Sequence, residues 1–438
     1  MKLTEMEVLQ FCEENDVKFV KLMFCDIFGN LRTISILASI LPEVFREGLT
    51  FHTFDETGFI GEYCDLRLFP DPDTLALLPW RPQHGRVVRF FCHIRYEDNT
   101  AFEGDGRFFL KNAVDYAAGK GYNFRVGTSC EFYCFNKDEN DKPTLEPLDN
   151  AGFCEAAPND KGENLRRDIC LTLEKMDIMP ESSLHEHGPG QNEVDFRYSS
   201  PLKAADNLVT FKNVVKTMAD RNGLYASFMP KPLPDNFGSG LHIILMCMKG
   251  TENIFEPKHG ELSDEAKSMM AGIINRAKEL TLIFDPTTNS YQRFGDRLAP
   301  AYVSWSYGNY SQLMRTIGKG RNENGVILRS PDNSCNPYYA IGLMIYACLE
   351  GALNHEQLCE PITKPYCYMS EDEISKLEPL PRTLGEAIEA ADKSDFLRDR
   401  LPEDFFDKYL NNRRKLFEEY EKAENKHSFE MFTYFNSL

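Results

Sequence analysis

The sequence lacks a long apolar run and a leader pattern at its start. No segment of the 438-residue chain reaches the about 18 consecutive apolar residues that a membrane-spanning helix needs. Glu5 and Glu7 interrupt the N-terminal segment where a secretory signal would be apolar. These absences predict a cytoplasmic protein with no membrane partner.

Closely spaced cysteines and an excess of basic residues are missing as well. The 13 cysteines are scattered, Cys130 and Cys134 are the closest two, and no Cys-x-x-Cys pair occurs. This pattern is typical of reduced thiols rather than of a disulfide framework or a zinc site. Only 49 Lys and Arg face 68 Asp and Glu, which gives a net charge of −19. That charge argues against nucleic acid or an anionic membrane surface as a partner.

Residues 183–196 contain the first pattern that points to chemistry. Glu186 and Glu193 flank a Gly-Pro-Gly turn, which excludes a continuous helix and predicts two short segments joined tightly. Paired carboxylates in this arrangement suit a hard cation such as Mg²⁺ or Mn²⁺. From the spacing alone, a polar surface hairpin remains the alternative.

The N-terminal part of the chain predicts a small α+β unit. A capping box at Thr4 and Glu7 starts a helix, and residues 18–24 and 31–36 form a hairpin with Val20, Leu22 and Phe24 on one face. The composition shifts near residues 98–106, and we place a domain boundary there, dividing the chain into residues 1–100 and 101–438.

Longer elements follow this boundary. Hydrophobic periodicity predicts helices over residues 107–120, 161–176, 204–222, 264–285, 338–349 and 402–426. Apolar, β-rich runs predict strands over residues 123–135, 224–229 and 241–248. The fold class is therefore α+β, with no internal repeat.

Six groups of short motifs carry a family resemblance. They occupy residues 24–29, 69–80, 183–196, 204–242, 289–293 and 329–338, and include Phe-Pro-Asp-Pro-Asp-Thr, Asn-Ser-Tyr-Gln-Arg and Arg-Ser-Pro-Asp-Asn-Ser-Cys-Asn-Pro-Tyr. In this order and spacing the chain resembles glutamine synthetases of the short type I class over nearly its whole length. The resemblance implies an N-terminal β-grasp domain and a catalytic domain with a curved antiparallel sheet and flanking helices.

The resemblance also implies an assembly and a reaction. Family members form homo-oligomeric rings, usually two stacked hexamers in a dodecamer, and the aspartate that matches Asp26 completes the active site of a neighbouring subunit. They make an acyl phosphate from glutamate and ATP, and ammonia, deprotonated by a carboxylate, attacks it. Two divalent ions offset the phosphate charge.

The first metal site of the family is matched completely. By resemblance, its ligands are Glu131, Glu186 and Glu193. The second site keeps only His242, because its other two ligands fall on Ser129 and Ile327. An alcohol and an alkyl group do not bind Mg²⁺ tightly, so the sequence predicts one Mg²⁺ or Mn²⁺ site. For His242, a core histidine bonded to backbone remains the alternative.

The substrate side of the family site is also matched. Arg293 and Arg329 correspond to the arginines that hold the carboxylates of glutamate, and Gly238 to a backbone contact. This predicts a pocket for a glutamate-like ligand. Structural ion pairs are the alternative for the two arginines. Arg315, a phosphate-binding arginine of the family, is kept.

Other catalytic positions are substituted. The carboxylate that deprotonates ammonium falls on Leu298, although Asp296 is close enough to serve if the loop is reshaped. An arginine that binds phosphate is replaced by Tyr310, and an asparagine before the glycine loop by Phe237. These losses weaken the binding of a triphosphate and leave ATP as an uncertain cofactor.

Three hypotheses fit this pattern. The first is a glutamine-synthetase-like protein without ordinary ATP-dependent glutamine synthesis, either a pseudoenzyme or an enzyme repurposed for a glutamyl compound. The second is a divergent ATP-dependent ligase that joins glutamate to ammonia or an organic amine. The third is a non-catalytic subunit that regulates an active paralogue. We favour the first, because the second metal, the base and the phosphate-binding cations are lost together.

Overall fold

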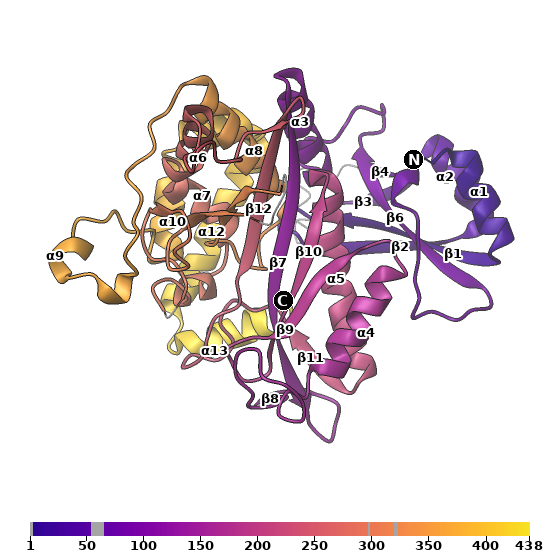
Figure 1. The fold of residues 1–438 in the computed structure, drawn as a ribbon. Helices are drawn as coiled ribbons and strands as arrows, with labels where there is room; N and C mark the ends of the chain where they lie inside the picture. The colour runs from indigo at the N-terminus through magenta and orange to yellow at the C-terminus, as the bar shows by residue number, and fades with distance from the viewer. Residues whose placement is uncertain (1–2, 54–64, 297, 319–322) are drawn as a thin grey trace.

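The chain forms two sheets with helices around them (Figure 1). This computed structural model describes residues 3–53, 65–296, 298–318 and 323–438. The N-terminal residues form the smaller unit, which carries α1 (Glu5–Glu14) and α2 (Leu41–Glu47). The larger unit follows it. Within the described ranges no helix is long and apolar enough to span a membrane.

The N-terminal sheet has the order β2-β1-β6-β4-β3, with β5 beside β6. Its strands are β1 (Val17–Cys25), β2 (Leu31–Leu37), β3 (Leu49–His52), β4 (Asp65–Pro70), β5 (Ala76–Leu77) and β6 (Arg86–Arg95). The predicted hairpin is confirmed as the antiparallel pair β1–β2, and β1 pairs in parallel with β6. Val20, Leu22 and Phe24 share one buried face, as the alternation requires. The capping box at Thr4 is also present.

The larger sheet is organised around β7, a strand of 16 residues. The strand order is β14-β15-β16-β12-β7-β10-β9, with β8 and β11 on β7 and β13 on β12. The strands are β7 (Tyr122–Lys137), β8 (Pro143–Pro147), β9 (Pro180–His185), β10 (Gln191–Ser199), β11 (Leu224–Ser227), β12 (Leu241–Lys249), β13 (Glu252–Asn253), β14 (Trp305–Ser306), β15 (Met314–Ile317) and β16 (Gly325–Leu328). All described pairings are antiparallel except β14–β15.

Helices lie on both sides of this sheet. Figure 1 shows α6, α7, α8, α10 and α12 gathered on one side and α4 and α5 on the other. The helices are α3 (Gly106–Gly119), α4 (Glu163–Glu174), α5 (Pro201–Arg221), α6 (Asp264–Ile274), α7 (Ala277–Phe284), α8 (Pro337–Leu353), α9 (Glu371–Ile374), α10 (Leu384–Asp392), α11 (Asp395–Arg400), α12 (Glu403–Lys422) and α13 (Lys426–Glu430).

The prediction of one continuous helix over residues 264–285 is wrong. The helix breaks at Asn275 and Arg276, where the backbone of Arg276 reaches φ −105° and ψ 5°. The Arg276 guanidinium pairs with Glu350 and Glu356, and the Asn275 amide also donates to Glu356 at 2.8 Å. These long-range contacts fix the two residues outside a regular helix, and local periodicity cannot reveal them.

Asn336 joins the two units at the start of α8. Its Oδ1 accepts from Tyr338 N and caps the helix, while its Nδ2 donates to the carbonyls of Asp26 and Ile27 at 3.2 and 3.3 Å. Gly29 makes this approach possible, because a Cβ there would lie 2.8 Å from Asn336 Cα and its φ is +84°. The β1–β2 turn therefore packs directly on the start of α8, a helix of the larger unit.

Candidate functional site

Strand register brings the polar candidates to one face of the larger sheet. Glu193 of β10 lies opposite Glu131 of β7, and His242 of β12 lies opposite Ser129, two residues before Glu131 on the same face. Ile327 of β16 lies beside the β12 strand, opposite Ile244. These residues line a cavity of about 410 Å³, called the central cavity below.

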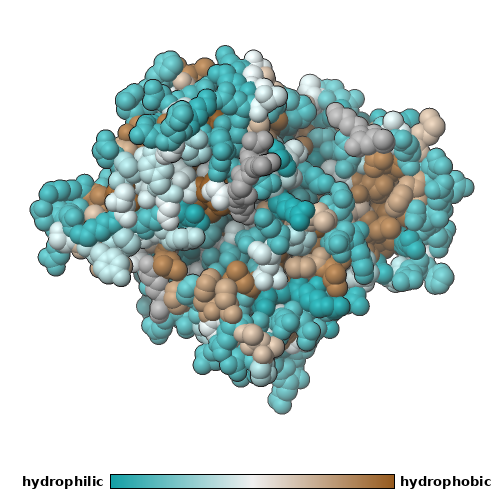
Figure 2. Space-filling view, viewed as in Figure 1, coloured by the Kyte–Doolittle hydropathy of each residue, from teal (hydrophilic) through white to brown (hydrophobic). Residues whose placement is uncertain are grey.

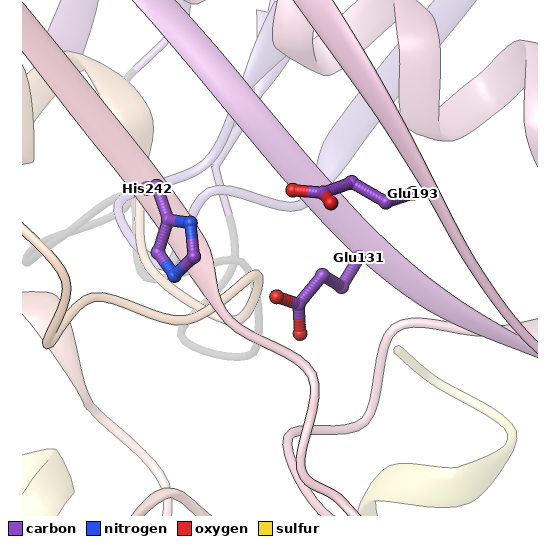
Figure 3. A group of neighbouring side chains, drawn as sticks. All are labelled: Glu131, Glu193 and His242. Carbon is purple, nitrogen blue, oxygen red and sulfur yellow. The ribbon is translucent and has the colours of Figure 1, made fainter. Parts of the chain in front are cut away.

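Glu131, Glu193 and His242 form a potential metal-ligand group. One donor atom from each lies within 4.8 Å of the others, and Figure 3 shows the three side chains converging from neighbouring strands. Burial and the neighbouring Glu186 raise the pKa of Glu131 to about 7, and burial with Glu131 raises that of Glu193 well above its usual value. Burial and Arg329 lower the pKa of His242, so its imidazole is neutral and can bind a cation.

Glu186 lies on the wall of the same cavity but outside this group. Its Oε2 accepts hydrogen bonds from the backbone N and from Nδ1 of His187, at 2.9 and 2.8 Å. The two predicted segments are confirmed as β9 and β10, which pair antiparallel around the turn. The role of Glu186 as a direct ligand stays a prediction.

Two residues that the sequence analysis missed hold this turn. His185 contacts the Asp149 carboxylate through Nε2 at 2.9 Å and the Glu186 carbonyl through Nδ1 at 2.7 Å. Asp149 also accepts from the backbone N of Gly190 at 3.0 Å. Because Asp149 is distant in sequence, only the imidazole beside Glu186 could have suggested this contact.

The two arginines of the predicted carboxylate pocket differ in their partners. Arg293 is buried, and its Nη1 lies 3.3 Å from Asp285 Oδ1 and donates to the Ser330 carbonyl at 3.0 Å. Arg329 donates to the Leu298 carbonyl at 3.1 Å, and burial lowers its pKa to about 10. Arg329 is therefore the arginine with more capacity for an incoming carboxylate.

Gly238 packs closely against Arg293. A Cβ at this position would lie 2.4 Å from Arg293 Cγ, so no larger residue fits without moving the arginine. Arg315, the kept phosphate-binding arginine, lies with its guanidinium carbon 4.1 Å from the ring centre of Tyr310. Tyr310 thus stands where the family pattern has a second arginine, and its ring makes a cation–π contact with Arg315.

At the β12–β16 end of the cavity two positions carry alkyl side chains, while Arg315 of β15 lies opposite Ile327. Ile244 and Ile327 are buried and face each other across the strand pair. Ser129 donates a hydrogen bond to Glu193. Leu298 is 44% exposed at the cavity edge, and Asp296 forms an ion pair with Lys231. The proposed substitute base is therefore already bound to a cation.

Three aromatic rings form a stack on the cavity wall beside Glu186. The His187 ring lies 4.3 Å from Phe153, at 26°, and 4.9 Å from Phe237, at 35°. All three residues line the central cavity. The stack gives this part of the cavity an apolar, flat surface.

Asp26 lies away from this cavity, in the β1–β2 turn. Its carboxylate is buried, pairs with Arg32 at 2.9 Å and accepts from Asn30 Nδ2 at 3.0 Å. Burial raises its pKa. Its contribution to a neighbouring subunit stays a prediction.

Comparisons with known proteins agree with this architecture. The family model described as "Glutamine synthetase, beta-Grasp domain" matches residues 16–97, and "Glutamine synthetase, catalytic domain" matches residues 103–432. The chain is 38% identical to the "Glutamine synthetase" of Methanosarcina mazei, over 99% of this chain and 98% of that protein. It is 36% identical to that of Clostridium saccharobutylicum, over 99% of both.

Solved structures show the same fold. "Apo GmaS without ligand" has a TM-score of 0.87 and 25% sequence identity, and covers 97% of this chain and 98% of that one. "GmaS/ADP complex-Conformation 1" has a TM-score of 0.86 at the same identity and coverage. Together with the two family models, these matches confirm the predicted β-grasp domain and curved-sheet catalytic domain; the boundary between residues 100 and 101 stays a prediction.

Proposed function

Because the chain belongs to the glutamine synthetase family, we propose that it binds one divalent cation and a glutamate-like ligand without performing ordinary ATP-dependent glutamine synthesis. The cation and the ligand would share the central cavity. The observation that carries this proposal is the pair Ile244 and Ile327, two alkyl side chains that face each other where the family pattern has a polar group and a metal ligand. Phosphoryl transfer with two metal ions needs a metal ligand at the position of Ile327, although Arg315, opposite Ile327, is kept.

The residues at the other end fit a single cation. Family members use divalent metals and ATP, and Glu131, Glu193 and His242 offer two carboxylates and one imidazole within 4.8 Å. This mixed set suits Mn²⁺, and Mg²⁺ less well, because Mg²⁺ prefers oxygen ligands. A bound cation would supply positive charge that offsets the two crowded carboxylates and orients an acidic ligand.

Arg329 supports binding of a carboxylate beside the cation. Its guanidinium is buried and donates a hydrogen bond to the Leu298 carbonyl. The negative charge of Glu131 lies near enough to favour the charged form of Arg329. A planar guanidinium can hold a ligand carboxylate with two parallel hydrogen bonds. Asp285 and Asp332 largely occupy Arg293, so we assign Arg293 to positioning of the cavity wall.

A second candidate is a ligase that joins a glutamyl group to an organic amine. The stack of Phe153, His187 and Phe237 favours it, because aromatic faces bind alkylammonium groups through cation–π contacts. The solved relative titled as a GmaS/ADP complex shows that a protein of this fold binds ADP. Tyr310 and Ile327 count against the same nucleotide site in this chain.

The N-terminal domain supports association with further subunits. Its edge strand β2 exposes Leu37, and Phe19 of β1 is also exposed, at 54% and 47%. Figure 2 shows hydrophobic side chains gathered over this domain. An exposed apolar edge favours pairing with another chain. We propose hexameric rings or a dodecamer in which Asp26 approaches the site of a neighbouring subunit. In a mixed assembly, a paralogous subunit would cover the same apolar edge.

Calorimetric titration tests the proposal directly. Mn²⁺ is expected to bind at one ion per chain, and Glu131→Gln is expected to weaken binding at least about 100-fold, since even outer-shell changes cost 10–100-fold. Glu146→Gln, an exposed glutamate on β8, is the matched control. Glutamate should bind in the presence of Mn²⁺, and millimolar ATP should not. Clear ATP binding with amine-dependent phosphate release would replace this proposal by the ligase.

A further inference from the structure

A second cavity, of about 550 Å³, lies between the N-terminal domain and α5. Five basic residues line it: Lys21 and Arg32 of the β1–β2 hairpin, Arg81, and Lys212 and Lys216 of α5. No Asp or Glu side chain occurs among the described residues of its wall, which also includes Leu438, the last residue, with its terminal carboxylate. We call it the cationic cavity. It is unusual in a chain with a net charge of −19, where acidic partners are abundant.

Among the described residues, one of these five cations forms an ion pair with a carboxylate. Arg32 pairs with Asp26 at 2.9 Å. Lys212 and Lys216 donate to the carbonyls of Asn333 and Ser437, at 3.0 and 3.2 Å. Lys21 is 3.5 Å from the Ser35 hydroxyl. In the described part of the chain, no ion pair joins a carboxylate to either of these α5 lysines, to Lys21 or to Arg81.

Holding these charges together has a cost. Burial, with the help of Lys212, lowers the pKa of Lys216 to about 8. Burial and the neighbouring Arg81 lower the pKa of Lys21. Partly buried like charges destabilise a fold unless an ion offsets them. The arrangement thus has the charge, the concave shape and the size of a site for a small anion.

We propose that the cationic cavity binds a small phosphate-bearing molecule. Three of its four unpaired cations are lysines, whose compact ammonium groups suit phosphate oxygens as point charges. Trp80 and Leu78 add an apolar wall beside them, on which a non-phosphate part of the ligand can pack. The walls come from both domains, so the bound molecule bridges the domain junction. The two cavities share no lining residue, so this site is separate from the central cavity of the same chain.

Inorganic pyrophosphate is the probe for the test. Calorimetric titration should show one site per chain, and pyrophosphate should raise the thermal unfolding temperature. Lys212→Gln combined with Lys216→Gln is expected to weaken binding at least tenfold. Lys203→Gln is the matched control, because Lys203 is on the same helix but pairs with Asp177. Arg315→Gln should also bind normally, which separates this site from the central cavity.

The remaining outcomes decide against the proposal. Unchanged affinity in the double variant, or loss in Arg315→Gln instead, would place the anion elsewhere. Equal or tighter binding of citrate, with the same dependence on the α5 lysines, would overturn the phosphate assignment in favour of carboxylates. Since removing lysines from a repelling cluster should not destabilise the fold, the variants should melt at or above the native temperature. Lys216→Gln alone should also melt at or above the native temperature, and its loss of pyrophosphate affinity should be intermediate.

Discussion

The two ends of the central cavity are built by the same sheet but carry opposite chemistry. At the β7–β10 end, Glu131 and Glu193 face each other across paired strands, with His242 close by. At the β12–β16 end, the equivalent cross-strand pair is Ile244 and Ile327. The strand pairing is regular at both ends. The sheet therefore forms with charged or with apolar cross-strand pairs, so strand pairing alone does not account for the carboxylates at the β7–β10 end.

The acidic end shows the cost of keeping such charges. Burial and Glu186 raise the pKa of Glu131, and burial and Glu131 raise the pKa of Glu193. Ser129 relieves this crowding, because its hydroxyl donates to Glu193 where the family pattern has another carboxylate. With a serine at position 129, one cation can offset the charges of Glu131 and Glu193. A third carboxylate at that position would require a second cation.

The largest expected effect separates the two arginines. Arg293→Met should lower the free energy of unfolding by about 3–5 kcal/mol, because it leaves the buried Asp285 without its counter-charge. Arg329→Met should change stability by less than about 1 kcal/mol, yet weaken glutamate binding about tenfold. Urea denaturation and calorimetry measure the two quantities. Equal losses of stability in both variants would contradict the separation.

The next effect tests whether the apolar end can be converted. Ser129→Glu combined with Ile327→Glu places two carboxylates around His242, which already lies beside Ser129 across β7 and β12. Mn²⁺ stoichiometry should rise from one to two ions per chain, with the added site in the millimolar range or tighter.

Each single variant is the control for this conversion, since one carboxylate and one imidazole hold a hard cation weakly. If the double variant folds and still binds a single ion, the loss of the second site depends on more than these two positions.

The smallest expected effect is the pH dependence of stability that His93, at the junction of the two domains, contributes. His93 lies 3.6 Å from Asp71, but burial and Arg107 lower its pKa to about 4. Arg107 prevails because it pairs with Asp71 itself, at 3.0 Å. The unfolded histidine binds a proton below about 6.5 while the folded one does not, so stability falls as the pH drops from 6.5 to 4.

Urea denaturation at several pH values measures this slope. The His93 contribution should be about 1–2 kcal/mol after allowance for partial exposure. His93→Gln should flatten the slope, whereas His259→Gln, at an exposed position, should not. A slope that is unchanged in His93→Gln would assign the acid sensitivity to other groups.

The sequence was sufficient for the fold and for most of the central cavity. Periodicity located α3, α5 and β7 to within a few residues, since their apolar faces are long and regular. The prediction of one continuous helix failed at Asn275 and Arg276, because contacts with glutamates distant in sequence determine their backbone conformation. The distinct partners of Arg293 and Arg329 were equally hidden, because Asp285 and Asp332 become neighbours only through tertiary packing.

The dual role of Asn336 has a consequence for how the molecule opens. One side chain caps α8 and also donates to the carbonyls of the β1–β2 turn, so fraying of the first turn of α8 breaks two contacts with the N-terminal domain. The two domains are thereby coupled in one cooperative unit, and amide protons at the start of α8 and in the hairpin should exchange with solvent together.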